Sequence, residues 1–593
     1  MRIAVIDRNA CNPDKCQHEC VRFCPGVRMG EKTIFLSNNE PIINEVLCTG
    51  CGICVKKCPF EAIKIINLPE QLSSDLIHEY GPNGFRLFRL PLVKFGKITG
   101  IVGKNGIGKT TAINILSGKL IPNLGGKKSS RDDVIEYFRG TQMHRYFKAL
   151  YNEELKVALK PQPIYLIPNL VRGKVKSILE KLDEKGKMDF VAQELNLTES
   201  LGKRMKELSG GELQRLAIAI AYLKQADVYY FDEPSSYNDV YERLTVVRFI
   251  RKILGETKAI MVVDHDLAFL DYLSDEVAVV YGEAGAYGIF TRSESVRTGI
   301  NIFLDGYVPS ENVRFREKEI KFERRAPPKA TVQEEAIAVE YTELIKNWNG
   351  FKLKSEPGKI YRGEVVGVLG PNAIGKTTFI RMLAGEVEVD EGGFPVQTIG
   401  LSYKPQYLSN DFKGTVKDFL IEKSGKSSLS NFNLKSLLIP LNLHKLLERE
   451  VKALSGGELQ KLYIASCLSK EAEIYLLDEP SAFIDIEDRL TIISAITRYV
   501  KMFGKTGVVV DHDLLFVDSV SDRVIIFDGA PGVKGYAYAP MDKRTGFNKF
   551  LKNVGITIRR DSHTGRPRIN KEGSRLDRVQ RELGEYFYEP REA

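Results

Sequence analysis

The sequence predicts an α/β protein in which one domain occurs twice along the chain, behind a small α+β domain rich in cysteine. Three observations support this fold class. At about 100–200 residues per domain, the 593 residues are enough for several domains. Five short motifs appear between residues 103 and 265 and recur in the same order between 370 and 512. Eight of the nine cysteines lie between Cys11 and Cys58.

The composition is that of an ordinary folded protein, with 43% hydrophobic and 27% charged residues. It excludes a wholly disordered, collagen-like or fibrous chain. No run approaches the roughly 18 apolar residues of a membrane span. The N-terminus turns polar after a short apolar strand, unlike a signal peptide, so we expect a cytoplasmic protein without membrane contact. The net charge of +9 permits a nucleic-acid partner without requiring one.

The spacing of the recurring motifs indicates two copies of one domain. From the glutamine of each Lys-Pro-Gln string to the serine of each Leu-Ser-Gly-Gly-Glu string there are 47 and 49 residues. From that serine to the glutamate of each Asp-Glu-Pro string there are 24 in both copies, and from there to a histidine 32 and 33. Chance does not produce three matching intervals, so we expect both copies to share one fold.

The motif positions divide the chain into five parts. The cysteine-rich domain is expected at residues 1–75, copy one at 76–291, a linker at 292–335, copy two at 336–540 and a basic C-terminal segment at 541–593. Prolines and alternating charges mark the linker, namely Pro309 and Pro327-Pro328. We expect the linker and the C-terminal segment to act as hinges.

Copy one carries 23 extra residues between its loop lysine and its glutamine, which predict a helical insertion at about 128–158. Val134, Ile135 and Phe138 would share one helical face, so the insertion could pack on its own domain as a lid. The insertion also carries basic side chains, namely Arg139, Arg145 and Lys148. An extra helical pair on one copy only favours the second interpretation, a docking element for a phosphate backbone.

The C-terminal segment holds four arginines close together in sequence: Arg559, Arg560, Arg566 and Arg568. A solvated charge run is the usual state of such a stretch. Two functional interpretations stay open, contact with a nucleic acid and packing within the chain as part of a hinge.

Each copy contains a phosphate-binding loop (P-loop) of the pattern G-x-x-x-x-G-K-T, at Gly103–Thr111 and Gly370–Thr378, between an apolar strand and a helical pattern. Backbone N–H groups of such a loop surround phosphates, the lysine reaches the β- and γ-phosphates, and the threonine holds Mg²⁺. The residues expected to bind ATP and Mg²⁺ here are Gly103, Asn105, Gly106, Gly108, Lys109, Thr110 and Thr111, and Gly370, Asn372, Gly375, Lys376, Thr377 and Thr378. Ala373 stands where copy one has Gly106, and alanine costs about 1 kcal/mol there if the position needs a positive φ.

An apolar strand ends in Asp232-Glu233 in copy one and in Asp478-Glu479 in copy two. The aspartate can hold Mg²⁺, and the glutamate can orient or deprotonate the attacking water. Acidic strand ends are common, but two at equal distance from a P-loop predict a phosphoryl-transfer site. Each copy also supplies a glutamine and a histidine expected at this site, namely Gln162, Gln406, His265 and His512. A single histidine is usually structural, whereas its matched placement in both copies favours a contact to the γ-phosphate.

A Leu-Ser-Gly-Gly-Glu string opens a helix in each copy and exposes backbone N–H groups suited to an anion. We call these strings signature motifs, and their binding residues are Ser209, Gly210 and Gly211, and Ser455, Gly456 and Gly457. A P-loop and a signature motif cannot readily cover one nucleotide within a single domain. We therefore expect a head-to-tail arrangement, in which each P-loop faces the signature motif of the other copy.

The order of P-loop, glutamine, signature, Asp-Glu-Pro and histidine resembles the ABC-type ATPase family over residues 76–530, in a single-chain form with two cassettes. The resemblance implies two ATP molecules held between the cassettes and hydrolysis that reopens them. It implies adenine stacking on aromatic residues ahead of each P-loop, with Tyr80, Phe85 and Phe351 as candidates. Without a membrane segment, the chain is similar to mechanochemical ABC proteins and not to a transporter half.

Cys48, Cys51, Cys54 and Cys58-Pro59 follow the spacing of bacterial ferredoxins, in which the fourth cysteine ligates the other [4Fe–4S] cluster. A looser set ends in Cys24-Pro25. We therefore expect a ferredoxin-like domain with two clusters, held by Cys24, Cys48, Cys51 and Cys54, and by Cys11, Cys16, Cys20 and Cys58. Structural zinc sites are the alternative. With no flavin or nicotinamide motif elsewhere, we favour a structural role for the clusters, and Cys467 is expected to be buried.

The combination of this cysteine domain with two cassettes resembles the E subfamily of ABC proteins, the ribosome-recycling ATPases of archaea and eukaryotes also called RNase L inhibitors. Further points of resemblance are the insertion containing YFRG and the strings LDGYVPSENVRFR and RRD…RPRIN. This chain departs from the family pattern at Ala373 and at Asn238, where the family usually carries glycine and leucine. The departures put in question whether both sites hydrolyse ATP at equal rates.

The resemblance implies that ATP closes the cassettes and the hinges swing the iron–sulfur domain, which separates the ribosomal subunits. It implies binding to the ribosome, above all the small subunit and its rRNA, together with a release factor or its Pelota-like relative, and initiation factors as further candidates. Two rival functions are an ATP-gated iron–sulfur redox protein and a DNA-repair type ATPase. The second rival usually carries long coiled-coil arms, for which the intervals here are too short.

Overall fold

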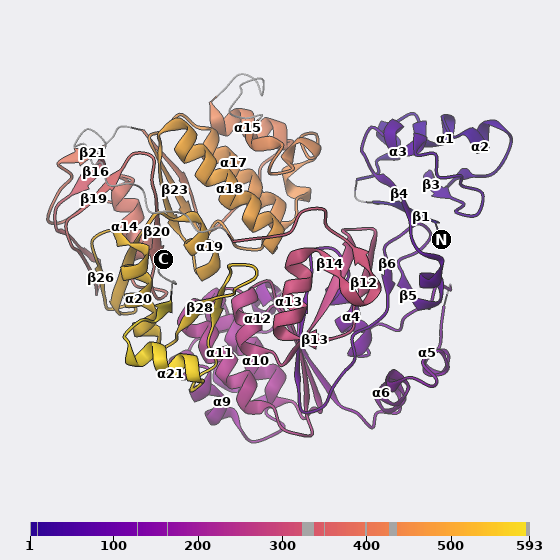
Figure 1. Ribbon diagram of the computed structural model, residues 1–593, viewed down its shortest axis with the longest axis horizontal. Helices are drawn as coiled ribbons and strands as arrows, with labels where there is room; N and C mark the ends of the chain where they lie inside the picture. Colours follow the sequence, from indigo (N-terminus) through magenta and orange to yellow (C-terminus); the bar gives the residue numbers. More distant parts are fainter. Residues whose placement is uncertain are drawn as a thin grey trace.

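The computed structural model describes residues 2–8, 10–126, 128–162, 164–322, 337–348, 350–397, 400–425 and 436–588 (Figure 1). Part of the expected linker, residues 323–335 with Pro327-Pro328, lies outside these described residues. The predicted fold class is confirmed, because two α/β copies follow a small α+β domain. In Figure 1 the two copies lie side by side and the N-terminal domain lies beside copy one.

The N-terminal domain is built on two short antiparallel strand pairs and three short helices. Its strands are β1 (Arg2–Ile6), β2 (Ile34–Ser37), β3 (Glu40–Ile43) and β4 (Ile63–Asn67), and its helices are α1 (Glu19–Arg22), α2 (Pro25–Arg28) and α3 (Ile53–Lys57). Strand β1 pairs with β4 and β2 with β3. Four buried cysteines, Cys20, Cys24, Cys48 and Cys54, share a core with Ala4, Ile6, Ile34, Ile43 and Ile63.

Copy one contains a nine-stranded sheet in the order β5-β6-β12-β11-β7-β10-β9-β8, with β13 paired to β11. The strands are β5 (Leu76–Glu79), β6 (Arg86–Phe88), β7 (Ile98–Val102), β8 (Val157–Lys160), β9 (Val228–Asp232), β10 (Ala259–Val263), β11 (Glu276–Glu283), β12 (Tyr287–Phe290) and β13 (Glu294–Ser295). Its main helices are α4 (Lys109–Leu116), α8 (Val175–Leu182), α9 (Met188–Glu194), α10 (Gly210–Leu223), α11 (Val240–Ile253), α12 (Leu267–Leu273) and α13 (Val296–Asp305). The central strands are parallel.

Copy two repeats this order as β17-β18-β26-β25-β20-β24-β23-β22, with β27 paired to β25. The strands are β17 (Leu344–Trp348), β18 (Phe351–Ser355), β20 (Val365–Leu369), β22 (Leu401–Lys404), β23 (Ile474–Asp478), β24 (Thr506–Val510), β25 (Arg523–Ala530), β26 (Lys534–Ala537) and β27 (Met541–Asp542). The helices are α14 (Lys376–Leu383), α15 (Val416–Ser424), α17 (Gly456–Ser469), α18 (Ile486–Phe503) and α19 (Leu514–Val520). A further small sheet joins β16 (Ile337–Tyr341), β19 (Gly358–Tyr361) and β21 (Val396–Gln397).

The insertion forms α5 (Arg131–Tyr137) and α6 (Gln142–Tyr151). Val134, Phe138 and Phe147 are buried against copy one, so the apolar face packs on its own domain as the lid interpretation expected. The hydroxyl groups of Tyr146 and Tyr230 lie 2.5 Å apart and join α6 to strand β9. The basic side chains Arg139, Arg145 and Lys148 are exposed, so the outer face stays available to a partner.

The C-terminal segment forms α20 (Lys543–Val554), β28 (Ile558–Arg560), β29 (Pro567–Ile569), α21 (Arg575–Glu582) and β30 (Phe587–Tyr588). Its arginines point into the protein: Arg566 is fully buried and, with Arg568, pairs with Asp271 of α12. Arg560 pairs with Asp518 of α19. Nucleic-acid contact through Arg560, Arg566 and Arg568 is therefore wrong, because carboxylates of both copies already bind them. The alternative, packing within the chain, matches the structure, and the hinge role stays a prediction.

The N-terminal domain is attached to copy one by buried polar contacts. The Asn83 side chain accepts a hydrogen bond from the Ile43 N–H at 2.7 Å and donates one to the Ile43 carbonyl at 3.0 Å. Arg86 pairs with Glu45 at 3.0 Å. A buried side chain that forms hydrogen bonds with both the N–H and the carbonyl of one residue fixes the two surfaces relative to each other. The N-terminal domain therefore has a fixed position on copy one.

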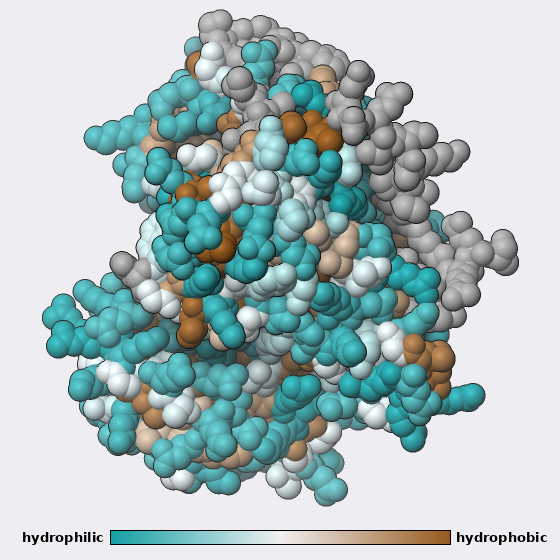
Figure 2. Space-filling model, turned by 90° about the vertical axis from the view of Figure 1, so that its left-hand side faces the viewer, coloured by the Kyte–Doolittle hydropathy of each residue, from teal (hydrophilic) through white to brown (hydrophobic). Residues whose placement is uncertain are grey.

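Polar residues dominate the face of the molecule in Figure 2, on which hydrophobic residues form small separate patches. Within the described ranges, no helix has both the length and the apolar character needed to cross a bilayer.

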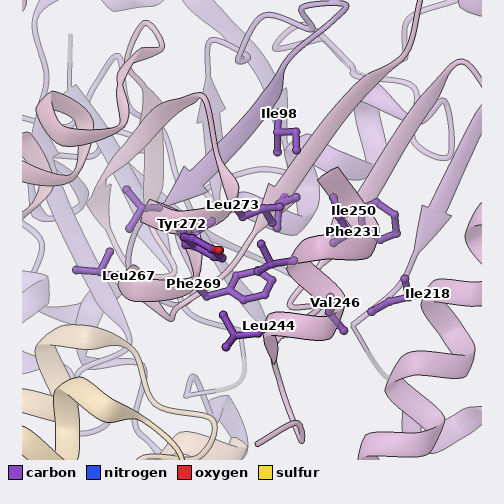
Figure 3. Close-up of a cluster of buried hydrophobic side chains, with 14 of the residues drawn as sticks. Ile98, Ile218, Phe231, Leu244, Val246, Ile250, Leu267, Phe269, Tyr272 and Leu273 are labelled. Carbon is purple, nitrogen blue, oxygen red and sulfur yellow. The ribbon is translucent and has the colours of Figure 1, made fainter. Parts of the chain in front are cut away.

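The core of copy one fixes the elements that carry its site. Side chains of β7, β9, α10, α11 and α12 meet in one cluster that includes Ile98, Ile218, Phe231, Leu244, Val246, Ile250, Leu267, Phe269, Tyr272 and Leu273 (Figure 3). Every residue of β7, β9 and β10 is buried. Because parallel strands buried on both faces cannot slip in register without exposing apolar side chains, the loops at their carboxyl ends are held in fixed positions.

Candidate nucleotide sites between the two copies

The two P-loops have the same geometry. Gly108 and Gly375 precede α4 and α14 with φ angles of 92° and 94°, which a residue with a Cβ rarely adopts. The Lys109 ammonium donates to the carbonyl of Gly103 at 2.8 Å, and the Lys376 ammonium donates to that of Gly370 at 2.7 Å. Both lysines thus fold back over their loops, where a phosphate group could replace the carbonyls as the partner.

Burial lowers the pKa of Lys109 and of Lys376 to about 8, although nearby carboxylates oppose the shift. A bound triphosphate favours the charged ammonium and raises this pKa, so ATP binding should take up protons above pH 8. Affinity should then fall by up to about tenfold per lysine for each pH unit above the pKa of the free protein.

Calorimetry at pH 8.5 in two buffers with different ionisation enthalpies measures this uptake. The same titration at pH 6.5, where both lysines are protonated, is the control. Equal binding enthalpies in both buffers at pH 8.5 would contradict the expectation.

Ala373 adopts a φ of 55°, so the position does require the left-handed region and alanine is strained there. Its counterpart Gly106 has a φ of 72°. Both carbonyls accept a backbone hydrogen bond from a glycine, Gly532 for Ala373 and Gly285 for Gly106, at 2.8 and 2.9 Å. The turn is therefore the same in both copies.

The variant Ala373→Gly should stabilise copy two by about 1 kcal/mol, because glycine removes the left-handed strain. Gly106→Ala should destabilise copy one by a similar amount, since its new Cβ would meet the nearest atom at an ordinary 3.6 Å and only the backbone is strained. Urea unfolding midpoints check both changes. A lower midpoint for Ala373→Gly would contradict the first.

A hydroxyl and a carboxylate meet beside each P-loop, as predicted. Thr110 Oγ1 donates to Asp232 Oδ2 at 3.0 Å, and Thr377 Oγ1 donates to Asp478 Oδ2 at 3.0 Å. Hard oxygen ligands of this kind suit Mg²⁺, which uses few protein ligands alongside phosphate oxygens and water. The donor set therefore fits one Mg²⁺ at each P-loop.

The glutamates lie next to the glutamines and histidines named from the sequence. Gln162 Nε2 donates to Glu233 Oε1 at 2.7 Å, and Gln406 Nε2 donates to Glu479 Oε1 at 2.5 Å. His265 Nε2 lies 3.6 Å from Glu233 Oε1, and His512 Nε2 lies 3.4 Å from Glu479 Oε1. The structure thus brings all three side chains together in each copy.

Backbone and burial both make these glutamates unusual. Glu233 and Glu479 adopt φ angles of 49° and 48°, a strained conformation for glutamate of the kind found at functional sites. Burial, together with the Asp232 carboxylate, raises the pKa of Glu233. At Glu479 burial acts in the same direction, but the hydrogen bond to His512 outweighs it and lowers the pKa. Burial lowers the pKa of His265 well below its usual range, so this imidazole is neutral at pH 7. A carboxylate with a raised pKa is suited to accept a proton from water.

Two further pairs of residues belong to the sites and were not named from the sequence. Lys160 and Lys404 are buried, and each donates to the carbonyl of the site aspartate at 2.6 Å. Asp264 and Asp511 accept from the hydroxyls of Ser235 and Ser481, both at 2.7 Å. The signal was present, since each lysine stands two residues before the site glutamine and each aspartate directly before the site histidine.

The copies touch through the turn that follows each Asp-Glu-Pro string. Asp239 Oδ2 of copy one accepts from the Asn372 N–H of P-loop two at 2.5 Å. Asp485 Oδ2 of copy two accepts from the Asn105 N–H of P-loop one at 3.2 Å. Each P-loop is thus contacted by the opposite copy, as the head-to-tail arrangement expected.

The two sites differ in how far they are assembled. A cavity of about 1590 Å³ lies between the copies and is lined by Lys376, Thr377 and Phe351 together with Ser209 and Gly211 of signature one. A smaller cavity of about 350 Å³ at Lys109 is lined by residues of copy one. Ser455, Gly456 and Gly457 of signature two, all within the described residues, line neither cavity. The structure therefore brings together P-loop two and signature one.

The aromatic candidates lie beside the P-loops. Phe85 and Tyr80 line the smaller cavity, and the Tyr80 hydroxyl lies 3.3 Å from Thr111 Oγ1. Phe351 lines the larger one. An ideal Cβ on Gly108 would lie 2.8 Å from Phe85, and one on Gly375 3.0 Å from Phe351. Phe85 and Phe351 thus pack on equivalent glycines, and half-exposed Tyr80 is the more accessible surface.

Comparison with known proteins identifies the family. The family model described as ABC transporter matches residues 92–236 and 353–482. The chain is 52% identical over 99% of its length to an uncharacterized ABC transporter ATP-binding protein of Methanocaldococcus jannaschii, covering 98% of that protein. It is 44% identical, over 99% of its length and 98% of the relative, to ABC transporter E family member 1 of Arabidopsis thaliana. The chain belongs to the ABC transporter E family.

Solved structures of the E family agree with this assignment. The structure titled "Model of ribosome-bound archaeal Pelota and ABCE1" matches with a TM-score of 0.94 at 52% identity and covers 99% of both chains. A complex of archaeal ribosomal stalk protein aP1 with archaeal ribosome recycling factor aABCE1 matches with a TM-score of 0.81 at 50% identity, covering 88% of this chain and 100% of that one. This E-family protein is an ATPase of the ABC type.

The cysteine domain of this E-family protein matches two further family models. "Possible Fer4-like domain in RNase L inhibitor, RLI" matches residues 1–32, and "4Fe-4S binding domain" matches residues 41–64. The domain is therefore an iron–sulfur domain, and the zinc alternative is set aside.

The thiols of the cysteine domain influence one another's pKa in two groups. Burial raises the pKa of Cys11, and the nearby thiols of Cys58 and Cys16 raise it further. Burial also raises the pKa of Cys20 to about 11, and Cys58 contributes to this shift. Burial also raises the pKa of Cys54 to about 12, to which Cys48, Cys51 and Cys24 add. Neighbouring thiols of this kind fit the two expected ligand sets, and Cys467 is buried apart from them.

Proposed function

We propose that this protein splits ribosomes into subunits in an ATP-dependent recycling reaction after termination or rescue. The observation that carries the proposal is the cavity formed jointly by P-loop two and signature one, in a protein whose iron–sulfur domain is attached to copy one. The matched structure with ribosome-bound Pelota supports a ribosomal partner. Relatives named translation initiation factor RLI1, such as that of Saccharomyces cerevisiae at 42% identity over 99% of this chain and 98% of the relative, support a role in translation.

The proposed partners are the ribosome, above all its small subunit and rRNA, and a release factor or Pelota-like factor. Initiation factors are further candidates, in line with the names of the relatives. The exposed basic face of the insertion suits a phosphate backbone. A protein with these partners works in the cytoplasm, and we propose that location.

ATP binding is proposed to close the two copies around both nucleotides. Lys109 and Lys376 would release their loop carbonyls and bind the β- and γ-phosphates. The N–H groups of the opposite signature motif would meet the γ-phosphate, since a helix N-terminus favours an anion. Mg²⁺ held by Thr110 and Asp232, and by Thr377 and Asp478, supplies neutralisation of the phosphate charge when bound.

Hydrolysis is assigned to the glutamates. Glu233 or Glu479 accepts a proton from water at its Oε1, while the neighbouring glutamine amide and histidine orient the water and the γ-phosphate. The reopened copies would then release the small subunit. Closure is transmitted through copy one to the iron–sulfur domain, whose two proposed [4Fe–4S] clusters keep it rigid enough to act as a lever.

A splitting assay tests this function. Post-termination ribosomes, a release factor, the full-length protein with its clusters, and ATP or a non-hydrolysable analogue are sedimented through a sucrose gradient. Free subunits that require protein, nucleotide and intact cysteines are the expected result, and splitting with the analogue assigns the movement to closure. Intact ribosomes with every nucleotide would refute the proposal.

A further inference from the structure

The turn after each Asp-Glu-Pro string differs between the copies at one buried position. Copy one carries Asn238 and copy two carries Ile484, and each residue is 1% exposed. The backbone of the turn is the same, because the Asn238 N–H donates to Ser235 at 3.3 Å and the Ile484 N–H donates to Ser481 at 3.4 Å. One equivalent position therefore holds a polar side chain in one copy and an apolar one in the other.

The Asn238 side chain joins this turn to the signature helix α10. Its Oδ1 accepts a hydrogen bond from Arg215 Nη1 at 3.3 Å, and its Nδ2 donates to the Pro234 carbonyl at 3.2 Å. Arg215 is buried and also pairs with Glu242. An ideal Cβ on Gly211 of the signature motif would lie only 3.3 Å from Asn238 Oδ1. Asn238 thus lies next to Gly211 of the signature motif and binds helix α10 through Arg215.

All of these groups face the second nucleotide site. Arg215, Asn238 and Glu242 line the cavity that contains Lys376. The next residue along the chain, Asp239, accepts from the Asn372 N–H of P-loop two. Asn238 therefore lies between the two elements that copy one presents to that site, the signature motif and the carboxylate of the turn.

The equivalent residues of copy two have a different chemistry. Lys461 replaces the arginine and pairs with Asp488 at 2.9 Å, and the side chain of Ile484 cannot form a hydrogen bond with it. An ammonium is a single point charge, whereas a guanidinium is a planar group that can be held by two partners at once. Neither Lys461 nor Ile484 lines the cavity at Lys109, and Ile484 lines the cavity that contains Lys376.

We propose that Asn238 is a positioning residue for ATP hydrolysis at the second site. It holds Arg215 and Asp239 so that signature one and the turn approach P-loop two as one unit. Copy two has no equivalent hydrogen bond, because the side chain of Ile484 is apolar. The inference rests on the proposed function only in taking both sites as hydrolytic.

The experiment measures each site alone in the full-length protein with its clusters. Glu233→Gln silences the first site and Glu479→Gln the second. With the first site silenced, Asn238→Ile should lower kcat about tenfold, since a hydrogen bond to a buried charged group is lost, while KM changes less than twofold. With the second site silenced, Asn238→Ile should leave kcat within twofold. Asn238→Leu also removes the hydrogen bond to Arg215, so it should lower kcat at the second site in the same way.

Two controls separate positioning from a general effect on the fold. In an Arg215→Lys background, which carries the copy-two residue, Asn238→Ile should have little further effect because its partner is already gone. Glu136→Gln, at an exposed position on the insertion, should change neither rate.

Two results would overturn the inference. One is an unchanged kcat at the second site, and the other is an equal loss at both sites with a lower Tm. Failure of the wild-type protein to split ribosomes would instead refute the proposed function and leave these site-resolved rates meaningful.

Discussion

Replacing Glu233 and Glu479 together by glutamine should slow ATP hydrolysis roughly 10²–10⁴-fold, the usual contribution of a general base. Glutamine keeps the size of the side chain and can still accept from Gln162 or Gln406 through its amide oxygen. It cannot accept the proton of water. Nucleotide binding should persist, because the lysines and threonines that hold the phosphates and Mg²⁺ are unchanged. The doubly substituted protein is therefore expected to retain ATP and remain closed.

Steady-state phosphate release measures the loss, and retention of labelled ATP on a filter measures the trapped state. Each single variant should leave the other site turning over, so neither single loss should reach that of the double variant. Glu136→Gln is the matched control, since Glu136 is exposed on the insertion, where it pairs with Arg139. A double variant that keeps a tenth or more of the wild-type rate would show that other groups activate the water.

Asp271→Ala should detach the C-terminal segment from copy one at a cost of about 3–5 kcal/mol. Asp271 accepts from Arg566 Nη1 at 3.0 Å and from Arg568 Nε at 2.7 Å, and it is nearly fully buried. Removing the carboxylate leaves the buried Arg566 guanidinium without its counter-ion, and its Nε and Nη2 already lack a hydrogen-bond partner. Arg568 keeps its ion pair with Asp561 at 3.3 Å. Burial lowers the pKa of Arg566 but leaves it charged at pH 7.

Guanidinium unfolding and limited proteolysis of the C-terminal segment measure this cost. Arg559→Ala is the control within the same segment, because Arg559 is partly exposed and has a single hydrogen bond to Asn570 at 2.7 Å. Its expected cost is about 1 kcal/mol. A protease-resistant segment and an unchanged midpoint in Asp271→Ala would mean that apolar contacts alone, such as those of Phe547 and Phe550, hold the segment in place.

The sequence by itself determined the two copies, the P-loops, the signature motifs and the family. These features are local, because a glycine-rich turn or a capped helix forms from residues within a few positions of one another. Thr110 and Asp232, although 122 residues apart, were also predictable, since parallel strands bring their carboxyl ends to one edge of a sheet. The alignment of Ala373 with Gly106 left open whether the position needs a positive φ, and the structure decides it with a φ of 55°.

Only the tertiary structure decided which charged side chains are paired inside the protein. The arginines near residue 560 looked like a solvated or nucleic-acid-binding run, but Arg566 meets a carboxylate 295 residues earlier in the chain. Asp239 reaches a P-loop 133 residues away. Such pairs depend on how whole copies pack together, and neither periodicity nor local charge carries that information. Burial then determines how much each ion pair matters for stability, because a buried charge that loses its partner cannot be solvated by water and destabilises the fold.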